Sequence, residues 1–405
     1  MVHMGSKNIK SFSNVLLIIG IIFVAFNLRP AITSVGPIID LIRSDLGISN
    51  GVAGFITTLP LISFAILSIL APKIGQTIGN ERTIFLGLLV LCIGIFTRSL
   101  GYTLTLFLGT LLVGVGVAIG NVLIPSIVKL HFPLKVGIIT SIYTTAMNAF
   151  AAIGSGISIP LAKGLFLGWR WALAFWVLVA VIAMIIWLPQ IRNNKKPSTT
   201  YKNQPSNGAM WRSPIAWQVT VFMGLQSFLF YCTVAWLPEI LESHGMQLSM
   251  AGWVVSLMQL VSLPTTFLAP VIANRFKSQK MMVGIIGIIY FIGVMGLMFV
   301  QTNGLLILSI ICIGIAQGAS ISLALTMIGL RTRDSRQAAN LSGMAQSIGY
   351  LLAAIGPTLI GFLFDYTQSW LTPLVIFTVI TILMTLAGIG AGRKQYVAGE
   401  LAQKY

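Results

Sequence analysis

The stretch VLLIIGIIFVAFNLRP, residues 15–30, decides the fold class of this chain, because residues 15–26 carry no polar side chain. A membrane span needs about 20 mostly apolar residues, and similar runs recur along all 405 residues. Hydrophobic residues make up 56% of the chain and charged residues only 8%, whereas soluble domains carry roughly 25% charged residues. The sequence therefore predicts an integral membrane protein. No small-residue cleavage site follows residue 26, so we expect the first run to remain as a span.

The apolar runs predict an all-α protein, because a transmembrane barrel would need alternating strands of about 10 residues and these runs are long and continuous. Twelve spans would occupy roughly 240–300 residues and leave short loops. The predicted spans cover residues 14–41, 51–74, 82–100, 104–130, 136–162, 169–190, 214–241, 249–274, 280–300, 303–330, 336–364 and 370–391. The polar residues 192–213 then form a linker between an N-terminal six-helix bundle (1–191) and a C-terminal one (214–405).

The basic residues alternate between loops in a way that predicts the topology. The net charge of +17 would suggest a nucleic-acid partner in a soluble protein, but lysine and arginine collect in the cytoplasmic loops of membrane proteins. With the N-terminus inside, the inside segments hold 20 of the 25 basic residues, and Arg29 lies within a span. The four outside are Arg43, Arg98, Lys163 and Arg170. We therefore expect a multi-pass protein of the cell membrane with both termini cytoplasmic and no nucleic-acid partner.

The two halves repeat at a constant shift of 198 residues. Ala53-Gly54 and Ala71-Pro72 recur as Ala251-Gly252 and Ala269-Pro270, and the residues Gly116, Ala118 and Gly120 recur as Gly314, Ala316 and Gly318. Duplicated six-helix halves place a solute site between them, near the middle of the bilayer.

With this organisation the chain resembles the major facilitator superfamily over essentially its whole length, and within it the branch of cyanate permeases and 2-nitroimidazole exporters. The motifs that carry the resemblance are Asn27-Leu28-Arg29-Pro30, Gly36-Pro37, Gly79-Asn80-Glu81-Arg82, Gly120-Asn121-Val122-Leu123-Ile124-Pro125 and Trp236-Leu237-Pro238. The resemblance implies two pseudo-symmetric six-helix bundles, alternating access, and a central cavity lined by spans 1, 4, 7 and 10.

Three departures from the superfamily pattern disfavour a proton-driven multidrug exporter. Gln76 stands where the loop after span 2 usually has an aspartate, and Thr110 stands where proton-coupled drug exporters carry an arginine. The cluster Gly154, Gly156 and Pro160 does not match the span-5 motif of drug/proton antiporters.

Arg29 is the sharpest functional signal in the sequence. Burying a charge near the bilayer centre costs at least ~2.5–3.5 kcal/mol, so such a residue normally faces a cavity and has a partner. A guanidinium offers a fixed fork of donors and remains charged, which suits an anionic or electron-rich solute. The alternative is a structural clamp on backbone carbonyls that Pro30 and Pro37 leave free.

Other polar side chains within the spans are candidates to line the solute site. The alternative for each is a hydrogen bond between helices, worth about 0.6 kcal/mol on average. These candidates are Asn27, Thr33, Asn121, Tyr143, Gln226, Tyr231, Gln259 and Gln317.

Candidate gating or coupling residues lie near the outer ends of spans 1 and 7, where Pro37 and Pro238 are predicted to break the helices. They are Pro37, Asp40, Trp236, Pro238 and Glu239. Asp40 and Glu239 are equally typical of solvated helix ends, and Trp236 of the interfacial aromatic belt. No carboxylate lies in the middle of a span, so protons remain only one option as the coupling ion, beside uniport and exchange.

The predicted function is transport of a small anionic or polar planar solute, cyanate-like or nitroimidazole-like, by alternating access. The alternatives are a broad-specificity drug exporter and, in another class, a non-transporting membrane receptor. An enzyme is excluded because no catalytic cluster is visible. We expect no cofactor or metal, free thiols at Cys92, Cys232 and Cys312, and a monomer whose partners are the solute and the bilayer.

Overall fold

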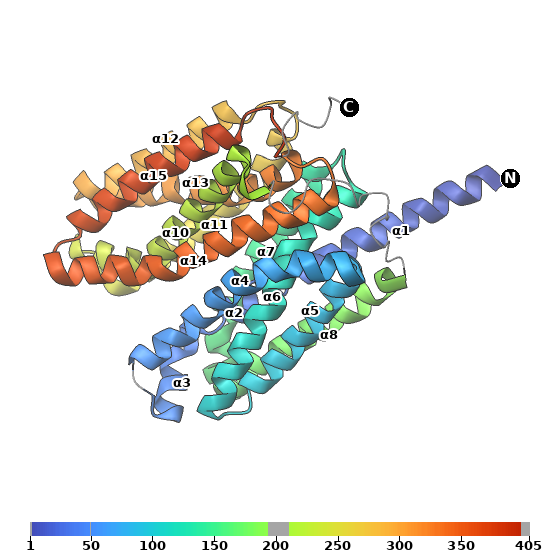
Figure 1. Cartoon of the computed structure of the whole chain (residues 1–405). Coiled ribbons are helices and arrows are strands. Elements are labelled where there is room, and N and C mark those ends of the chain that lie inside the picture. The colour runs from blue at the N-terminus through green and yellow to red at the C-terminus, as the bar shows by residue number, and fades with distance from the viewer. Residues whose placement is uncertain (1, 49, 193–209, 398–405) are drawn as a thin grey trace. The chain divides into compact units, whose positions relative to one another are not determined.

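The computed structural model describes residues 2–48, 50–192 and 210–397, and within these ranges the chain consists of helices joined by loops, without a strand (Figure 1). Twelve helical segments of the described chain are long and apolar enough to cross a membrane. This confirms the predicted all-α fold with twelve spans. Residues 193–209 of the predicted linker lie outside the described ranges.

The chain forms two compact units, and unit 1 comprises residues 1–133 and 142–204. Helices of this part of the chain are α1 (Val2–Ala25), α2 (Pro30–Thr33), η1 (Gly36–Ile38), α3 (Ile39–Leu46), α4 (Asn50–Ile78), α5 (Asn80–Arg98), α6 (Thr103–His131), α7 (Val136–Ile159), η2 (Pro160–Gly164) and α8 (Gly168–Arg192). The first span is therefore divided into several helical pieces.

Unit 2 comprises residues 134–141 and 205–405. Its helices are α10 (Pro214–Ser243), α11 (Leu248–Ala273), α12 (Lys280–Phe299), α13 (Asn303–Leu330), α14 (Ser335–Thr367) and α15 (Leu371–Ala391). The beginning of α7 belongs to this unit because the Ser141 hydroxyl donates to the Phe267 carbonyl, and a Cβ on Gly137 would lie 2.3 Å from Pro270 O. The division into halves at residues 192–213 stays a prediction.

The packing inside the two units follows the sequence repeat. In unit 1, α6 packs against α4 and α5, and α8 packs against α1 and α5. In unit 2, α13 packs against α11 and α12, and α15 packs against α10 and α12. Repeat-related glycines bring the backbones together, since a Cβ on Gly116 would lie 2.6 Å from Gly87 O, and one on Gly314 would lie 2.6 Å from Met258 O.

The prolines of spans 1 and 7 have different effects. Span 1 is interrupted, but α10 continues to Ser243 with Pro238 inside it. The predicted break at Pro238 is therefore wrong. A proline removes one backbone donor, and membrane helices tolerate this where local adjustments and neighbours satisfy the freed groups.

Candidate solute-binding site

The interruption of span 1 is the central feature of unit 1. Helix α1 ends at Ala25, and the Asn27 and Leu28 amides bond to carbonyls three residues back, Val24 O and Ala25 O, instead of four. Pro30 has no N–H to continue the helical ladder and disfavours helical geometry in the residue before it. Arg29 accordingly has φ −122° and ψ −41° and stands immediately before α2. The sequence thus places a guanidinium at a helix break inside a span.

Helix α7 holds this broken segment in place through hydrogen bonds. The Thr33 hydroxyl donates to Ala151 O at 3.0 Å. The Ser155 hydroxyl donates to Thr33 O at 3.2 Å, and the Ser158 hydroxyl donates to Ser34 O at 2.9 Å. These side chains replace ladder bonds that the interruption removes, so α2 is fixed against α7.

Close packing on both sides of Arg29 reinforces these hydrogen bonds. The rings of Phe26 and Phe150 stack with centroids 3.7 Å apart and an interplanar angle of 14°. A Cβ on Gly154 would lie 3.0 Å from Pro30 Cα, so the two backbones approach as closely as a glycine allows. Arg29, which is half-buried, therefore follows a residue stacked on α7, Phe26, and precedes a residue in close backbone contact with α7, Pro30.

A clamp on the freed carbonyls exists, and the residue that supplies it is Arg98. The Val35 amide donates to Ile32 O, three residues back, so the Ala31 carbonyl does not receive the helical hydrogen bond that Val35 would otherwise donate. The Arg98 guanidinium donates to the Ala31 carbonyl through one terminal nitrogen. Arg98 is the last residue of α5, within the predicted span 82–100, and is 1% exposed, and its place on the outer side stays a prediction. The sequence shows no signal for this clamp, because only the packing of α5 brings Arg98 to span 1.

Two predicted site residues of span 1 serve structural bonds. The Asn27 amide is 2% exposed and donates to Phe23 O at 2.9 Å and to Val179 O of α8 at 3.3 Å. Thr33 is the half-buried link to α7 described above. Both residues hold the break in shape, and their role in solute binding stays a prediction.

Asn121 and Tyr143 lie on helices that pack around the break. A Cβ on Gly120 would lie 2.5 Å from Leu28 Cδ2, so the neighbouring residue Asn121, 8% exposed, is at the level of the break. Tyr143 lies two helical turns before Phe150 and therefore on the same face of α7. The structure thus gathers Asn27, Arg29, Thr33, Asn121 and Tyr143 on the elements that surround one interruption.

The predicted site residues of unit 2 lie on three helices, α10, α11 and α13, and make separate contacts. The Gln226 amide folds back onto its own helix, donating to Met223 O at 3.1 Å and to the Ser227 hydroxyl at 2.7 Å. The Gln317 amide donates to the Tyr290 hydroxyl of α12 at 3.0 Å. Tyr231 and Gln259 are both half-buried, and the Tyr231 ring meets Phe230 edge-on. Gln226 and Gln317 are therefore engaged in packing.

The candidate gating residues belong to both units, and each is described within its own unit. Pro37 is exposed in η1, and Asp40 lies in α3 with its side chain outside the described part of the chain. The Trp236 indole donates to Pro357 O of α14 at 2.8 Å, which fixes α10 to α14. Glu239 is exposed near the end of α10. Their gating role stays a prediction.

Two charged contacts of unit 1 were missed. Asp45 accepts a hydrogen bond from the Trp169 indole at 2.9 Å and from Arg170 at 3.0 Å, and these bonds hold the pKa of Asp45 below its ordinary value.

The second contact lies at the start of α5. A carboxylate oxygen of Glu81 lies 3.3 Å from the His131 ring, and the backbone carbonyl of Glu81 accepts a hydrogen bond from the Trp187 indole. The sequence could have pointed to Glu81, because it is the one acidic residue between positions 46 and 238.

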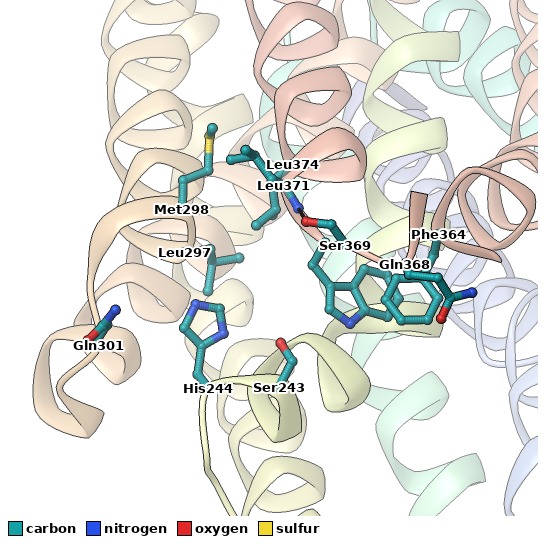
Figure 2. A pocket seen from close by; sticks show the side chains of 11 residues that line it. Ser243, His244, Leu297, Met298, Gln301, Phe364, Gln368, Ser369, Leu371 and Leu374 are labelled. Atoms are coloured by element: carbon teal, nitrogen blue, oxygen red, sulfur yellow. Dashed lines mark hydrogen bonds between the residues drawn. The ribbon is translucent and has the colours of Figure 1, made fainter. Parts of the chain in front are cut away.

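A separate pocket of about 610 Å³ lies in unit 2 (Figure 2). Its lining comes from the ends of α10, α12 and α14 and the start of α15, including His244, Met298, Phe364, Trp370 and Leu374. It contains none of the predicted site residues and no arginine or lysine. It therefore lacks an anchor for an anion.

The part of the chain that the structure describes contains no candidate metal site. No three His, Cys, Asp or Glu side chains of these residues are placed to hold a metal ion. Cys92, Cys232 and Cys312 are free thiols, as expected from their positions in apolar runs.

Comparison with known proteins gives consistent matches. The profile of the Major Facilitator Superfamily matches residues 15–354 and 237–395. The chain is 56% identical to the "Uncharacterized transporter YycB" of Bacillus subtilis (strain 168), covering 98% of both chains. It is 38% identical to the 2-nitroimidazole transporter of Escherichia coli (strain K12), covering 97% of this chain and 99% of the other.

More distant matches agree in fold. The cyanate transport protein CynX of Escherichia coli (strain K12) is 24% identical, over 88% of this chain and 91% of the other. The solved structure of the proton:xylose symporter XylE superposes with a TM-score of 0.73 at 13% identity, covering 95% of this chain and 98% of the other. This last likeness shows the fold alone.

Proposed function

The chain belongs to the major facilitator superfamily and is a transporter of a small solute, and we propose that this solute is a small anion or a polar planar ring, cyanate-like or nitroimidazole-like. The observation that carries the proposal is Arg29 at the interruption of span 1. Interrupted spans of secondary transporters form their solute sites near the bilayer midplane. The names of two relatives, a 2-nitroimidazole transporter and a cyanate transport protein, support the same class of solute.

The chemistry at Arg29 suits both kinds of solute. Cyanate is an anion, and a nitro group presents two electron-rich oxygens that match the fork of a guanidinium. The Phe26–Phe150 stack beside Arg29 supplies an apolar, aromatic wall of the sort that lines small-ligand pockets. In the described spans no carboxylate lies near the middle.

The orientation and membrane belong to the same proposal. We place both termini in the cytoplasm and the chain in the cell membrane, because 20 basic residues fall in the segments that this topology puts inside. Alternating access then moves the solute between the two sides, with residues of spans 1, 4, 7 and 10 as the lining.

Uptake by the purified protein in liposomes tests the proposal. Arg29→Gln removes the charge and one side of the fork, and a charge-assisted hydrogen bond contributes about 1.5–3 kcal/mol. We expect uptake of radiolabelled cyanate or 2-nitroimidazole at sub-saturating concentration to fall about 10- to 100-fold, with Arg29→Lys in between.

The matched control is Arg212→Gln, which removes an arginine from an exposed position before α10 and should transport normally. Unchanged uptake by folded Arg29→Gln would refute the role of Arg29. Transport of many unrelated lipophilic cations by the wild type would favour a broad drug exporter.

A further inference from the structure

The Arg98 guanidinium has more hydrogen-bond donors than the structure uses. Arginine carries five N–H donors, and the structure gives Arg98 one partner, the Ala31 carbonyl. Its Nε and its second terminal nitrogen are buried with no hydrogen-bond partner, and the residue is 1% exposed. An edge of the fork is therefore free inside unit 1.

The charge of Arg98 is also unbalanced among the described residues of unit 1. Glu81 lies at the other end of α5, about 25 Å away by the rise of 1.5 Å per residue, and is paired with His131. Asp45 is engaged by Trp169 and Arg170. The side chain of Asp40, the remaining acidic residue of unit 1, lies outside the described part of the chain. A buried charge without a partner is strongly unfavourable, and neither of the carboxylates that the structure describes in unit 1 balances Arg98.

Neighbouring hydroxyl groups add further donors. A Cβ on Gly109 would lie 2.3 Å from Arg98 N, which places Thr110 of α6 next to the Arg98 backbone. Thr110 is 1% exposed, and its hydroxyl has no partner. Ser34, one turn after Ala31, is fully buried, and its hydroxyl also has no partner. Two buried hydroxyl groups without a partner thus lie on the segments that pack against Arg98 and Ala31.

We propose that Arg98 binds a small monovalent inorganic anion, of the size of chloride, on its Nε edge, with Thr110 and Ser34 as the neighbouring donors. A water molecule could accept the same hydrogen bonds but would leave the buried charge unbalanced. This site is distinct from the proposed solute anchor Arg29. It would stabilise the clamp on Ala31 and so the interruption of span 1.

Thermal unfolding of the full-length protein tests the proposal without any transport measurement. The protein is purified in sodium gluconate, whose anion is too large for a buried site, and titrated with sodium chloride or bromide at constant ionic strength. A ligand that binds only the folded protein raises its stability, so we expect a saturable rise in Tm of about 2–4 °C. Arg98→Gln keeps an amide donor for Ala31 O but removes the charge, and should abolish the rise.

Arg29→Gln separates this site from the proposed solute anchor, because it should retain the full halide response. A response that survives in Arg98→Gln, or that the wild type lacks, would overturn the proposal and leave water as the occupant. Should Arg98→Gln fail to fold, anomalous scattering from wild-type crystals grown in bromide decides. A bromide ion within hydrogen-bonding distance of Arg98 Nε supports the site, and bromide found only elsewhere refutes it.

The same crystals distinguish the source of the anion. Loss of the Arg98 bromide peak on addition of millimolar cyanate would show that the site also binds cyanate. A peak that persists would identify a resident halide.

Discussion

At the scale of single residues, the sequence suggested two roles for Arg29, and in our account Arg29 and Arg98 each take one of them. Arg29 had two interpretations, a solute anchor and a clamp on free carbonyls. The structure gives the clamp on Ala31 to Arg98, and our proposal assigns the solute to Arg29. The sequence revealed Arg29 because an apolar run precedes it, but Arg98 lies at the end of its span, where a basic residue is common and carries no signal of burial.

The contact between Glu81 and His131 yields a prediction at the same scale. Glu81 is 2% exposed, and removing one partner of a buried pair costs about 3–5 kcal/mol. We expect Glu81→Ala to lower the Tm by several degrees more than Glu242→Ala, which removes an exposed carboxylate from the end of α10. Thermal unfolding in detergent measures both, and equal Tm values for the two variants would contradict the assigned contact.

At the scale of elements, the sequence predicted which segments are helices better than how they are interrupted. Long apolar runs gave twelve spans, since hydrophobic length determines which segments can cross a bilayer. Proline alone did not show which helix breaks. Pro238 stays within α10, whereas at Pro30 the side chains of Thr33, Ser155 and Ser158 supply substitute hydrogen bonds. Such bonds depend on contacts between helices, which one sequence does not reveal.

The link between α3 and α8 gives a prediction with a defined pH dependence. Hydrogen bonds from Trp169 and Arg170 lower the pKa of Asp45, so the folded state favours the carboxylate. Their stabilisation is present above the ordinary pKa of about 3.9 and is lost as the pH falls through the lower pKa of the folded state.

Asp45→Asn should therefore be slightly less stable than the wild type at pH 7, and the difference should shrink below pH 4. The effect is small because the Asp45 side chain is 44% exposed. Chemical unfolding across this pH range measures it, and a difference that grows on acidification would contradict the link.

At the scale of the whole molecule, the repeat and the charge bias could be read from the sequence because they involve many residues. The matching helix pairs of the two units agree with the repeat. The start of α7 departs from the simple division, because Gly137 and Ser141 contact α11. Among the predicted solute residues of unit 2, Gln226 and Gln317 form hydrogen bonds inside that unit, and their role in solute binding stays a prediction.

The topology is a prediction at this scale. Reporter fusions after residue 202, in the central polar segment, and at the C-terminus should both report the cytoplasm, as basic loops do. A fusion after Lys163, in a segment assigned to the outside, is the matched control and should report the opposite side. A cytoplasmic signal from all three positions would contradict the alternation of spans.

The central claim is that Arg29 binds the transported solute. Isothermal titration of the purified protein with 2-nitroimidazole and with cyanate, in the wild type and in Arg29→Gln, tests it most directly. The account predicts binding of at least one of these solutes to the wild type and at least a tenfold weaker affinity in the variant, about 1.4 kcal/mol. Equal affinity in the two proteins, with the variant correctly folded, would contradict it.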